Sequence, residues 1–346
     1  MSLSVEIEKN LGSFHLNVAF EAGDETLALL GGSGCGKSMT LKCIAGIERP
    51  DRGRIVVDGR VLFDSRQGID LSPQQRRVGV VFQNYALFPN MTVLQNLLAG
   101  ARREGDRGKR KRAVEEALER FGLEELAGRY PHQLSGGQQQ RAALARVLVS
   151  GPRLLLLDEP FSALDSHLRF RLEEETRQVI RQFGKTVLLV SHDRDEVFRM
   201  ARSIAIMDNG HIHKVGPKEE VFARPGTRAG AVLTGCKNIS PLLRLADGRV
   251  RAADWGMELE VEDDGRAGYL GIRMHDIRPG GGENSFLCRV VEEIENPFSY
   301  TVMLRPLGRK AARPIGWELD KERWRQLRGD QVEIHLPRGS ILLLED

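Results

Sequence analysis

The feature that most constrains this chain is a glycine-rich octapeptide, Gly31-Gly-Ser-Gly-Cys-Gly-Lys-Ser38, which fits the pattern G-x-x-x-x-G-K-[ST]. It follows the apolar run Thr26–Leu30 and precedes a helical pattern that begins near Lys37. Glycines let the backbone curl so that successive N–H groups point inward, and the helix adds its positive N-terminal end. The pattern therefore predicts a cradle for phosphate groups. A glycine-rich turn that holds no nucleotide is the alternative interpretation.

Two side chains of this loop have distinct chemical roles. Lys37 can place a positive charge on the β- and γ-phosphates of a nucleotide, and the Ser38 hydroxyl can join the shell of a Mg²⁺ ion. The remaining residues predicted to line the nucleotide here are Gly31, Gly32, Ser33, Gly34, Cys35, Gly36 and Met39.

The order of apolar patterns along the chain predicts two domains. Three short apolar runs each precede a helical stretch: Thr26–Leu30, Leu154–Leu157 and Thr186–Val190. Strands that alternate with helices predict an α/β domain with a mixed, mainly parallel sheet over residues 1–230, with a helical subdomain at about 90–150. Beyond residue 230, Gly and Pro become frequent and short alternating runs appear, which predicts a small β-rich domain over 231–346.

Composition excludes several other classes of protein. The formal net charge of +3 is small for 346 residues and gives no support to a nucleic-acid surface. The four cysteines are scattered, which disfavours a zinc site or a disulfide framework. The longest apolar runs fall far short of the ~20 residues that cross a bilayer, and no basic segment followed by an apolar one marks a secretory signal. If a membrane is involved, we expect another chain to span it.

A pair of carboxylates ends the apolar run Leu154–Leu157. Asp158, at the carboxyl end of the expected strand, can hold Mg²⁺ directly or through water. Glu159 points in a different direction and can polarise an attacking water as a general base. His192, after another expected strand, can donate to the terminal phosphate. The alternatives are a helix-capping carboxylate pair and a merely structural histidine.

Further segments occur in a fixed order around these residues: Val80-Val-Phe-Gln83, Leu134-Ser-Gly-Gly-Gln-Gln-Gln-Arg141, Ser162-Ala-Leu-Asp165 and Val190-Ser-His192. With the glycine-rich loop and the carboxylate pair, they make the chain resemble the ATP-binding-cassette ATPases over about residues 1–230. The resemblance implies a P-loop NTPase cassette that hydrolyses ATP with Mg²⁺. It also implies that Gln83 touches the metal ion and the attacking water, beside the base Glu159.

The resemblance implies a second copy of the chain as a partner. In the family, the segment that corresponds to Ser135, Gly136, Gly137 and Gln138 caps the γ-phosphate held by the opposite subunit of a homodimer. Asp165 corresponds to a residue that communicates across that interface. Integral membrane permease subunits and, indirectly, an extracytoplasmic solute-binding protein are the other implied partners, with the chain at the cytoplasmic face of the membrane.

Within the family, the likeness is strongest to molybdate importer ATPases, with Gly53–Asp64, Leu71–Arg77 and Asn284–Ile294 as the shared segments. It implies a regulatory C-terminal domain that resembles oligonucleotide/oligosaccharide-binding folds and binds an oxyanion. Sulfate, ferric ion, sugar or polyamine are the alternative cargoes. A soluble cassette ATPase that acts on DNA or ribosomes, or a non-hydrolytic regulatory binder, are competing classes.

Three positions depart from the family pattern: Gly32 replaces a common proline, Met39 replaces a common threonine, and no Tyr or Trp precedes residue 30 to stack on adenine. Phe14 is either that platform or a core residue. Two surface segments have alternative interpretations. Residues Tyr85, Leu87, Phe88 and Pro89 form either core or a groove for a permease helix, and the charged segment Arg102–Arg112 is either a solvated turn or an anion or lipid contact.

Overall fold

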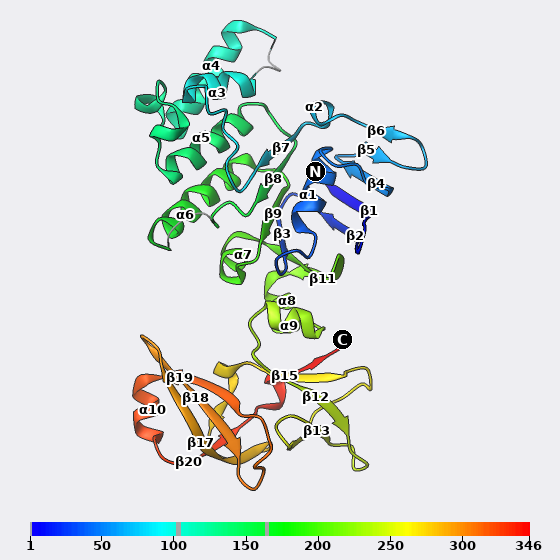
Figure 1. The fold of residues 1–346 in the computed structure, drawn as a ribbon, viewed down its shortest axis with the longest axis vertical. Helices are drawn as coiled ribbons and strands as arrows, with labels where there is room; N and C mark the ends of the chain where they lie inside the picture. Colours follow the sequence, from blue (N-terminus) through cyan, green and yellow to red (C-terminus); the bar gives the residue numbers. More distant parts are fainter. Residues whose placement is uncertain (1, 102–104, 163–165) are drawn as a thin grey trace. The chain divides into compact units, whose positions relative to one another are not determined.

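The computed structural model describes residues 2–101, 105–162 and 166–346 (Figure 1). It divides into two compact units, Met1–Lys218 and Glu219–Asp346. The boundary expected from sequence, after residue 230, lies further along the chain, because the helices α8 (Lys218–Ala223) and α9 (Arg228–Leu233) precede the first strand of unit 2. Among the described residues, no helix is both long enough and apolar enough to cross a membrane.

Unit 1 contains an 11-stranded sheet in the order β6-β5-β4-β1-β2-β11-β10-β3-β9-β8-β7. Strands β10, β3, β9, β8 and β7 pair in parallel, whereas β1 pairs antiparallel with both β2 and β4. The expected mixed sheet is therefore confirmed. The strands are β1 Leu3–Leu11, β2 Phe14–Ala22, β3 Thr26–Leu30, β4 Arg52–Val57, β5 Arg60–Asp64, β6 Ile69–Asp70, β7 Val78–Val81, β8 Leu154–Asp158, β9 Val187–Ser191, β10 Ser203–Asp208 and β11 His211–Pro217.

The central strands β3, β8 and β9 are buried at every position. Continuous apolar runs are what a parallel strand needs when helices cover both faces of its sheet. Strand β2 instead buries every second residue from Leu16 to Ala22, as a strand with one solvated face does. The burial of the three central strands matches the sequence expectation, and it places the carboxyl ends of these strands at one edge of a rigid core.

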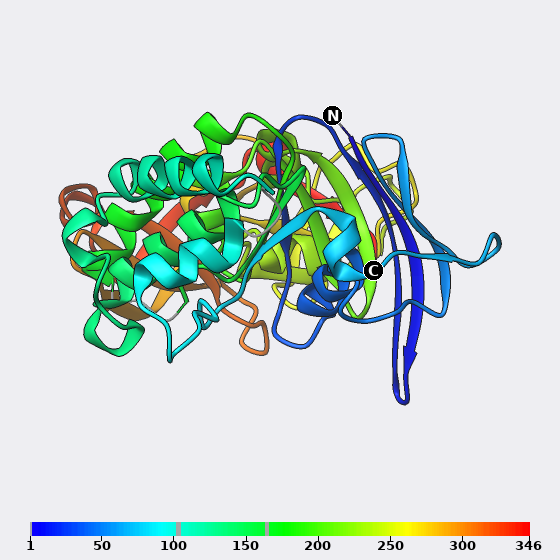
Figure 2. The ribbon, with the colours of Figure 1, turned by 90° about the horizontal axis from the view of Figure 1, so that it is seen from above.

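The helices of unit 1 include the subdomain that was expected at about residues 90–150. In Figure 2 its cyan and green helices lie at the other end of unit 1 from the dark-blue strands β1 and β2. Thr92 and Asp106 begin α3 and α4 by accepting hydrogen bonds from Gln95 N and Lys109 N. The helices are α1 Lys37–Ala45, α2 Pro73–Arg76, α3 Val93–Gly100, α4 Arg107–Arg120, α5 Gly136–Leu148, α6 Ser166–Phe183 and α7 Arg194–Met200, with 3₁₀ turns η2 Glu124–Leu126 and η3 Pro131–Gln133.

Unit 2 contains two five-stranded antiparallel sheets, in the orders β14-β13-β12-β15-β21 and β16-β20-β17-β18-β19, which confirms the expected β-rich C-terminal region. Trp255, Trp317 and Trp324 are buried in its core, and the last two rings pack edge to face. The strands are β12 Asn238–Arg244, β13 Val250–Ala252, β14 Met257–Leu259, β15 Tyr269–Ile272, β16 Arg278–Pro279, β17 Ser285–Glu295, β18 Ser299–Pro306, β19 Ile315–Asp320, β20 Gln331–His335 and β21 Ile341–Leu344, with helix α10 Lys321–Leu327 and 3₁₀ turns η4 Met274–Asp276 and η5 Arg338–Ser340.

Candidate functional site

The glycine-rich loop joins β3 to α1, as the sequence predicts. Gly34 and Gly36 have φ angles of 79° and 108°, in the left-handed region that favours glycine. At Gly31 an added Cβ would lie 2.3 Å from the Met207 carbonyl oxygen, so only glycine fits there. The Lys37 ammonium donates to the carbonyl oxygens of Gly31 (2.8 Å) and Gly32 (2.7 Å). The loop is therefore closed around its own lysine.

The C-terminal end of α1 is held by an arginine that the sequence did not single out as functional. Arg76 is 1% exposed and donates to the carbonyl oxygens of Cys43 (2.7 Å), Ile44 (3.0 Å) and Leu71 (2.8 Å). Its remaining partner is the carboxylate of Asp70, at 2.9 Å. Because the last carbonyls of a helix have no partners within the helix, Arg76 fixes the helix that carries the phosphate loop.

The acidic pair comes directly from the end of β8. The Ser38 hydroxyl donates to the Asp158 carboxylate at 2.9 Å, although 120 residues separate them in sequence. Burial raises the pKa of Asp158 above its usual range; the hydrogen bond from Ser38 opposes that shift and the charge of Glu159 adds to it. An alcohol and a carboxylate oxygen in contact are two of the oxygen ligands that Mg²⁺ prefers.

Glu159 and His192 meet at the neighbouring strand ends. The Nδ1 atom of His192 lies 3.2 Å from Oε1 of Glu159, because β8 and β9 are adjacent parallel strands. Glu159 has φ 45°, a left-handed conformation that is uncommon for a residue with a side chain. Strained backbone of this kind is often found at functional sites.

The segment after His192 is fixed by α7. Asp193 begins this helix by accepting from Asp195 N and Glu196 N, and its carboxylate also accepts from Arg169 at 3.1 Å. Glu196 is 3% exposed, and burial raises its pKa to about 8. The backbone next to His192 is therefore tied to two helices of unit 1.

The second glycine pair opens α5. Ser135 is the N-cap residue, and its side chain and that of Gln138 form a reciprocal capping box. Ser135 is exposed, while Gly137 is buried and packs closely on α6: an added Cβ would lie 3.0 Å from the side chain of Leu172. The helix start therefore presents backbone N–H groups and a hydroxyl to solvent, which suits an anion.

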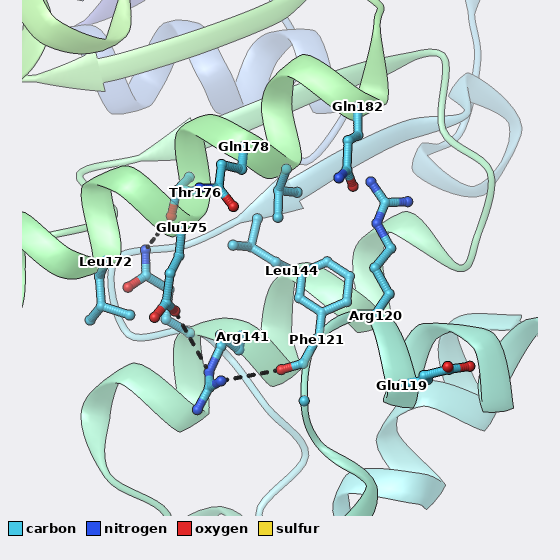
Figure 3. Close-up of a pocket in the computed structure, with 13 residues that line it drawn as sticks. Glu119, Arg120, Phe121, Arg141, Leu144, Leu172, Glu175, Thr176, Gln178 and Gln182 are labelled. Carbon is cyan, nitrogen blue, oxygen red and sulfur yellow. Dashed lines mark hydrogen bonds and ion pairs between the residues drawn. The ribbon is translucent and has the colours of Figure 1, made fainter.

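A cavity of about 370 Å³ lies behind α5, and its walls hold this helix against α6 (Figure 3). Arg141 donates to the carbonyl oxygen of Phe121 at 3.3 Å and lies 3.9 Å from the carboxylate of Glu175. Gln140 donates to the hydroxyl of Thr176 at 3.4 Å. These polar contacts and the packing of Gly137 against Leu172 hold α5 against α6.

Gln83 is exposed and follows β7 by two residues. The loop after it is fixed by two side chains that sequence reasoning missed. Asn96 is buried and its amide donates to the carbonyl oxygens of Phe88, Met91 and Thr92. Arg146 donates to the carbonyl oxygens of residues 85 and 86. A sequence signal for such contacts is an Asn or Arg within a helix, such as Asn96 or Arg146, whose side chain can donate to the carbonyl oxygens of a nearby loop.

The structure brings together only part of the predicted site. In the part of the chain that the structure describes, no hydrogen bond joins Gln83 or Ser135 to the Ser38–Asp158 or Glu159–His192 pairs. Met39 is half-buried against the apolar core. Phe14 also packs against the core, and its ring lies beside Gly36 of the phosphate loop. Asp165 lies outside the described residues.

The residues present fit a Mg–nucleotide. The loop has left-handed glycines where the backbone must turn its N–H groups inward, and Ser38 and Asp158 already place two hard oxygen ligands in contact. Ser33 and Gly34 are exposed, while Gly31, Cys35 and Lys37 are buried beneath them. Fold and site together define a P-loop nucleotide-binding cassette with a helical subdomain and an appended β-rich unit.

Comparison with known proteins agrees with this class. A family model described as "ABC transporter" matches residues 15–162. The molybdenum import ATP-binding protein ModC of Paramagnetospirillum magneticum is 42% identical over 238 residues, which cover 67% of this chain and 65% of that protein. The sulfate/thiosulfate import ATP-binding protein CysA 2 of Chromobacterium violaceum is 39% identical over 291 residues, 82% of this chain and 77% of its own. The chain therefore belongs to the ABC transporter family.

A solved structure gives the same fold. The dimer of an ATP-binding cassette in a post-hydrolysis state, bound to ADP and phosphate, has a TM-score of 0.53 and 29% identity. It covers 63% of this chain and 99% of that one. The chain spans just under two thirds of the length of the molybdenum relative.

Proposed function

We propose that this chain is the ATP-hydrolysing subunit of a membrane importer, with molybdate or a related oxyanion as its cargo. The observation that carries the ATPase proposal is the contact between Glu159 and His192 (3.2 Å) at the strand end next to the Ser38–Asp158 bond (2.9 Å). A base, a donor for the terminal phosphate and two metal ligands then lie at one edge of the sheet.

These side chains divide the tasks of the proposed reaction, and His192 has two: it donates to the terminal phosphate and it contacts Glu159. Lys37 leaves the carbonyls of Gly31 and Gly32 to contact the β- and γ-phosphates. Ser38 and Asp158 would hold Mg²⁺, which offsets triphosphate charge when bound. Glu159 takes a proton from the attacking water, and His192 orients that carboxylate through the observed contact.

The proposed active form is a homodimer that encloses two ATP molecules. Ser135, Gly136, Gly137 and Gln138 of one copy would cap the γ-phosphate held by Lys37 of the other, with Asp165 at the interface. The exposed start of α5 supports this arrangement, because the capping box uses the N–H groups of Ser135 and Gln138 but not those of Gly136 and Gly137, and N–H groups at a helix N-terminus bind anions. The dimeric state of the ADP-bound cassette that this chain resembles also supports it.

The proposed partners are permease subunits at the cytoplasmic face of the membrane and, indirectly, an extracytoplasmic solute-binding protein. Phe88 is 47% exposed and Leu87 is half-buried, whereas Tyr85 is buried at 5%. The groove proposed for a permease helix is therefore limited to residues 87–89. In cells that carry the chain with its permease, Phe88→Ser is expected to lower solute uptake while the purified chain keeps hydrolysing ATP. Unchanged uptake would count against the groove.

The ATPase proposal is tested with Glu159→Gln in the full chain. The variant is expected to bind ATP and Mg²⁺, to form a stable dimer in sedimentation, and to lose about a hundredfold or more in turnover, since a positioned base contributes about 10²–10⁴-fold. Glu174→Gln, which removes a half-buried carboxylate of α6 that pairs with Arg177, is the matched control and is expected to keep the rate. Normal turnover of Glu159→Gln would remove Glu159 from the mechanism.

The cargo proposal has a separate test, because all three tryptophans of the chain lie in unit 2. Their fluorescence in the full chain reports on unit 2 even when an oxyanion also enters the phosphate loop. Saturable change with molybdate and tungstate supports the proposal. A response to sulfate alone favours the sulfate alternative, which the 39% identical relative supports. No response to any of the three would remove oxyanion binding by unit 2.

A further inference from the structure

The amino ends of three parallel strands carry cations that the ATPase proposal does not use. Arg77 directly precedes β7, Arg153 directly precedes β8, and Lys185 lies two residues before β9. Val78 pairs with Leu154, and Leu155 pairs with Val187. Extending these registers by one or two residues places all three cations in one row across neighbouring strands, about 5 Å apart from strand to strand.

The three cations open into one hollow of about 680 Å³, which Ser2, Asp58 and Gly151 complete. Within the described ranges of the chain, the guanidinium groups of Arg77 and Arg153 make no ion pair or hydrogen bond. Lys185 donates to the carbonyl oxygen of Pro152 at 3.1 Å, which leaves its charge without a carboxylate. Three positive charges therefore line one hollow, and none of them is paired with a carboxylate among the described residues.

The single carboxylate of the hollow does not balance these charges. Asp58 accepts a hydrogen bond from the backbone N–H of Ser2 at 3.1 Å, and no ion pair ties it to the three cations among the residues that the structure describes. Like charges gathered without counter-ions repel one another. A multiply charged anion in the hollow would remove that repulsion and gain charge-assisted hydrogen bonds.

The hollow is separate from the phosphate loop. Arg153 and Asp158 lie at opposite ends of β8, about 16 Å apart for five residues of extended chain. The same three strands therefore carry Gln83, the Asp158–Glu159 pair and His192 beyond their carboxyl ends, and Arg77, Arg153 and Lys185 at their amino ends.

We propose that the row Arg77–Arg153–Lys185 is a second anion site, which binds a multiply charged phosphate group at the edge of the sheet opposite the nucleotide loop. The guanidinium groups suit phosphate oxygens through paired N–H donors, and the lysine adds a point charge. The phosphate can belong to a soluble phosphorylated compound or to the headgroup of an anionic lipid, and the two sources are separable by experiment.

The test uses the full chain with Lys37→Ala, which removes the lysine of the nucleotide loop, and inorganic pyrophosphate as the probe in titration calorimetry. Saturable binding is expected, and adding Arg153→Gln and Lys185→Gln should weaken it tenfold or more, since charge-assisted bonds are the strong ones. The control adds Lys111→Gln and Arg181→Gln, which remove the same charge from exposed helix positions. Circular dichroism confirms that each variant is folded.

A second arm identifies the source of the phosphate. Vesicles of phosphatidylglycerol and phosphatidylcholine are sedimented with the Lys37→Ala chain and with both sets of charge variants. If the vesicles retain the chain, and only Arg153→Gln with Lys185→Gln abolishes this retention, the site binds a lipid headgroup. If the chain binds pyrophosphate but is not retained by the vesicles, the site binds a soluble compound. The proposal is overturned if neither probe binds, or if the hollow variants and the control variants behave alike in both arms.

Discussion

Replacing Arg76 with methionine tests how the nucleotide loop is held in place. Methionine keeps an unbranched chain of similar length and removes every hydrogen-bond donor. In the described structure, the carbonyl oxygens of Ile44 and Leu71 have Arg76 as their hydrogen-bond donor, whereas that of Cys43 also accepts from Gly46 N. One buried acceptor and one partly buried acceptor are therefore left without their donor, at about 1–3 kcal/mol each. The expected loss in free energy of unfolding is about 3 kcal/mol.

The assay separates the two units, because unit 1 contains no tryptophan. In urea, Arg76→Met should lower the midpoint followed by far-ultraviolet circular dichroism by roughly 1 M, for a slope of about 3 kcal/mol per M. Tryptophan fluorescence should follow unit 2 with an unchanged midpoint. Amide hydrogen exchange should rise across Lys37–Ala45, because the C-terminal carbonyls of α1 lose their partner.

Arg77→Met is the matched control, since it removes an exposed guanidinium one residue away. It should change the free energy of unfolding by less than about 0.5 kcal/mol. If Arg76→Met and Arg77→Met had the same midpoint and the same exchange in α1, the buried arginine would not hold the loop helix, and the reasoning would be wrong.

Three further outcomes are expected. Between pH 4.5, the ordinary pKa of a glutamate, and about pH 8, the folded chain keeps a proton on Glu196 that the unfolded chain releases. The free energy of unfolding therefore falls as the pH rises through this window. Glu196→Gln should make the melting temperature less dependent on pH between pH 5 and 8.5, and an unchanged slope would refute this. Gly31→Ala should lower the melting temperature by several degrees, because its Cβ meets backbone, whereas Gly32→Ala, with open space around it, should not; equal effects would refute the crowding. Asn96→Ala should speed hydrogen exchange in residues 85–92, with the exposed Leu94→Ala as control; equal exchange would remove Asn96 as the anchor.

Local patterns predicted the central strands and the phosphate loop well. Strands β3, β8 and β9 are apolar runs whose burial depends on few partners, and the glycines of residues 31–36 specify their own turn. The capped start of α5 is equally local, since Ser135 and Gln138 are three residues apart and bond each other.

Contacts between residues far apart in the sequence could not be predicted from local patterns. Arg76 lies in a polar stretch that is typical of an exposed segment. It is buried because it donates to carbonyl oxygens at the end of α1, more than thirty residues earlier in the sequence. The contact of Glu159 with His192 depends on β9 lying beside β8, which strand order alone decides. Tyr85 looked like part of a surface patch, but its ring is buried.

We propose that Lys37 of one copy and Ser135 of a second copy contact the same ATP molecule. The most direct measurement is an experimental structure of Glu159→Gln with ATP and Mg²⁺, in which the distance from each Ser135 Oγ to each γ-phosphate is read. We expect a hydrogen-bond distance of about 3 Å between the Ser135 hydroxyl of one copy and the γ-phosphate held by the other. The proposal would be contradicted if each Ser135 contacted the γ-phosphate bound to its own copy, or if both Ser135 hydroxyls in the dimer lay far from any phosphate.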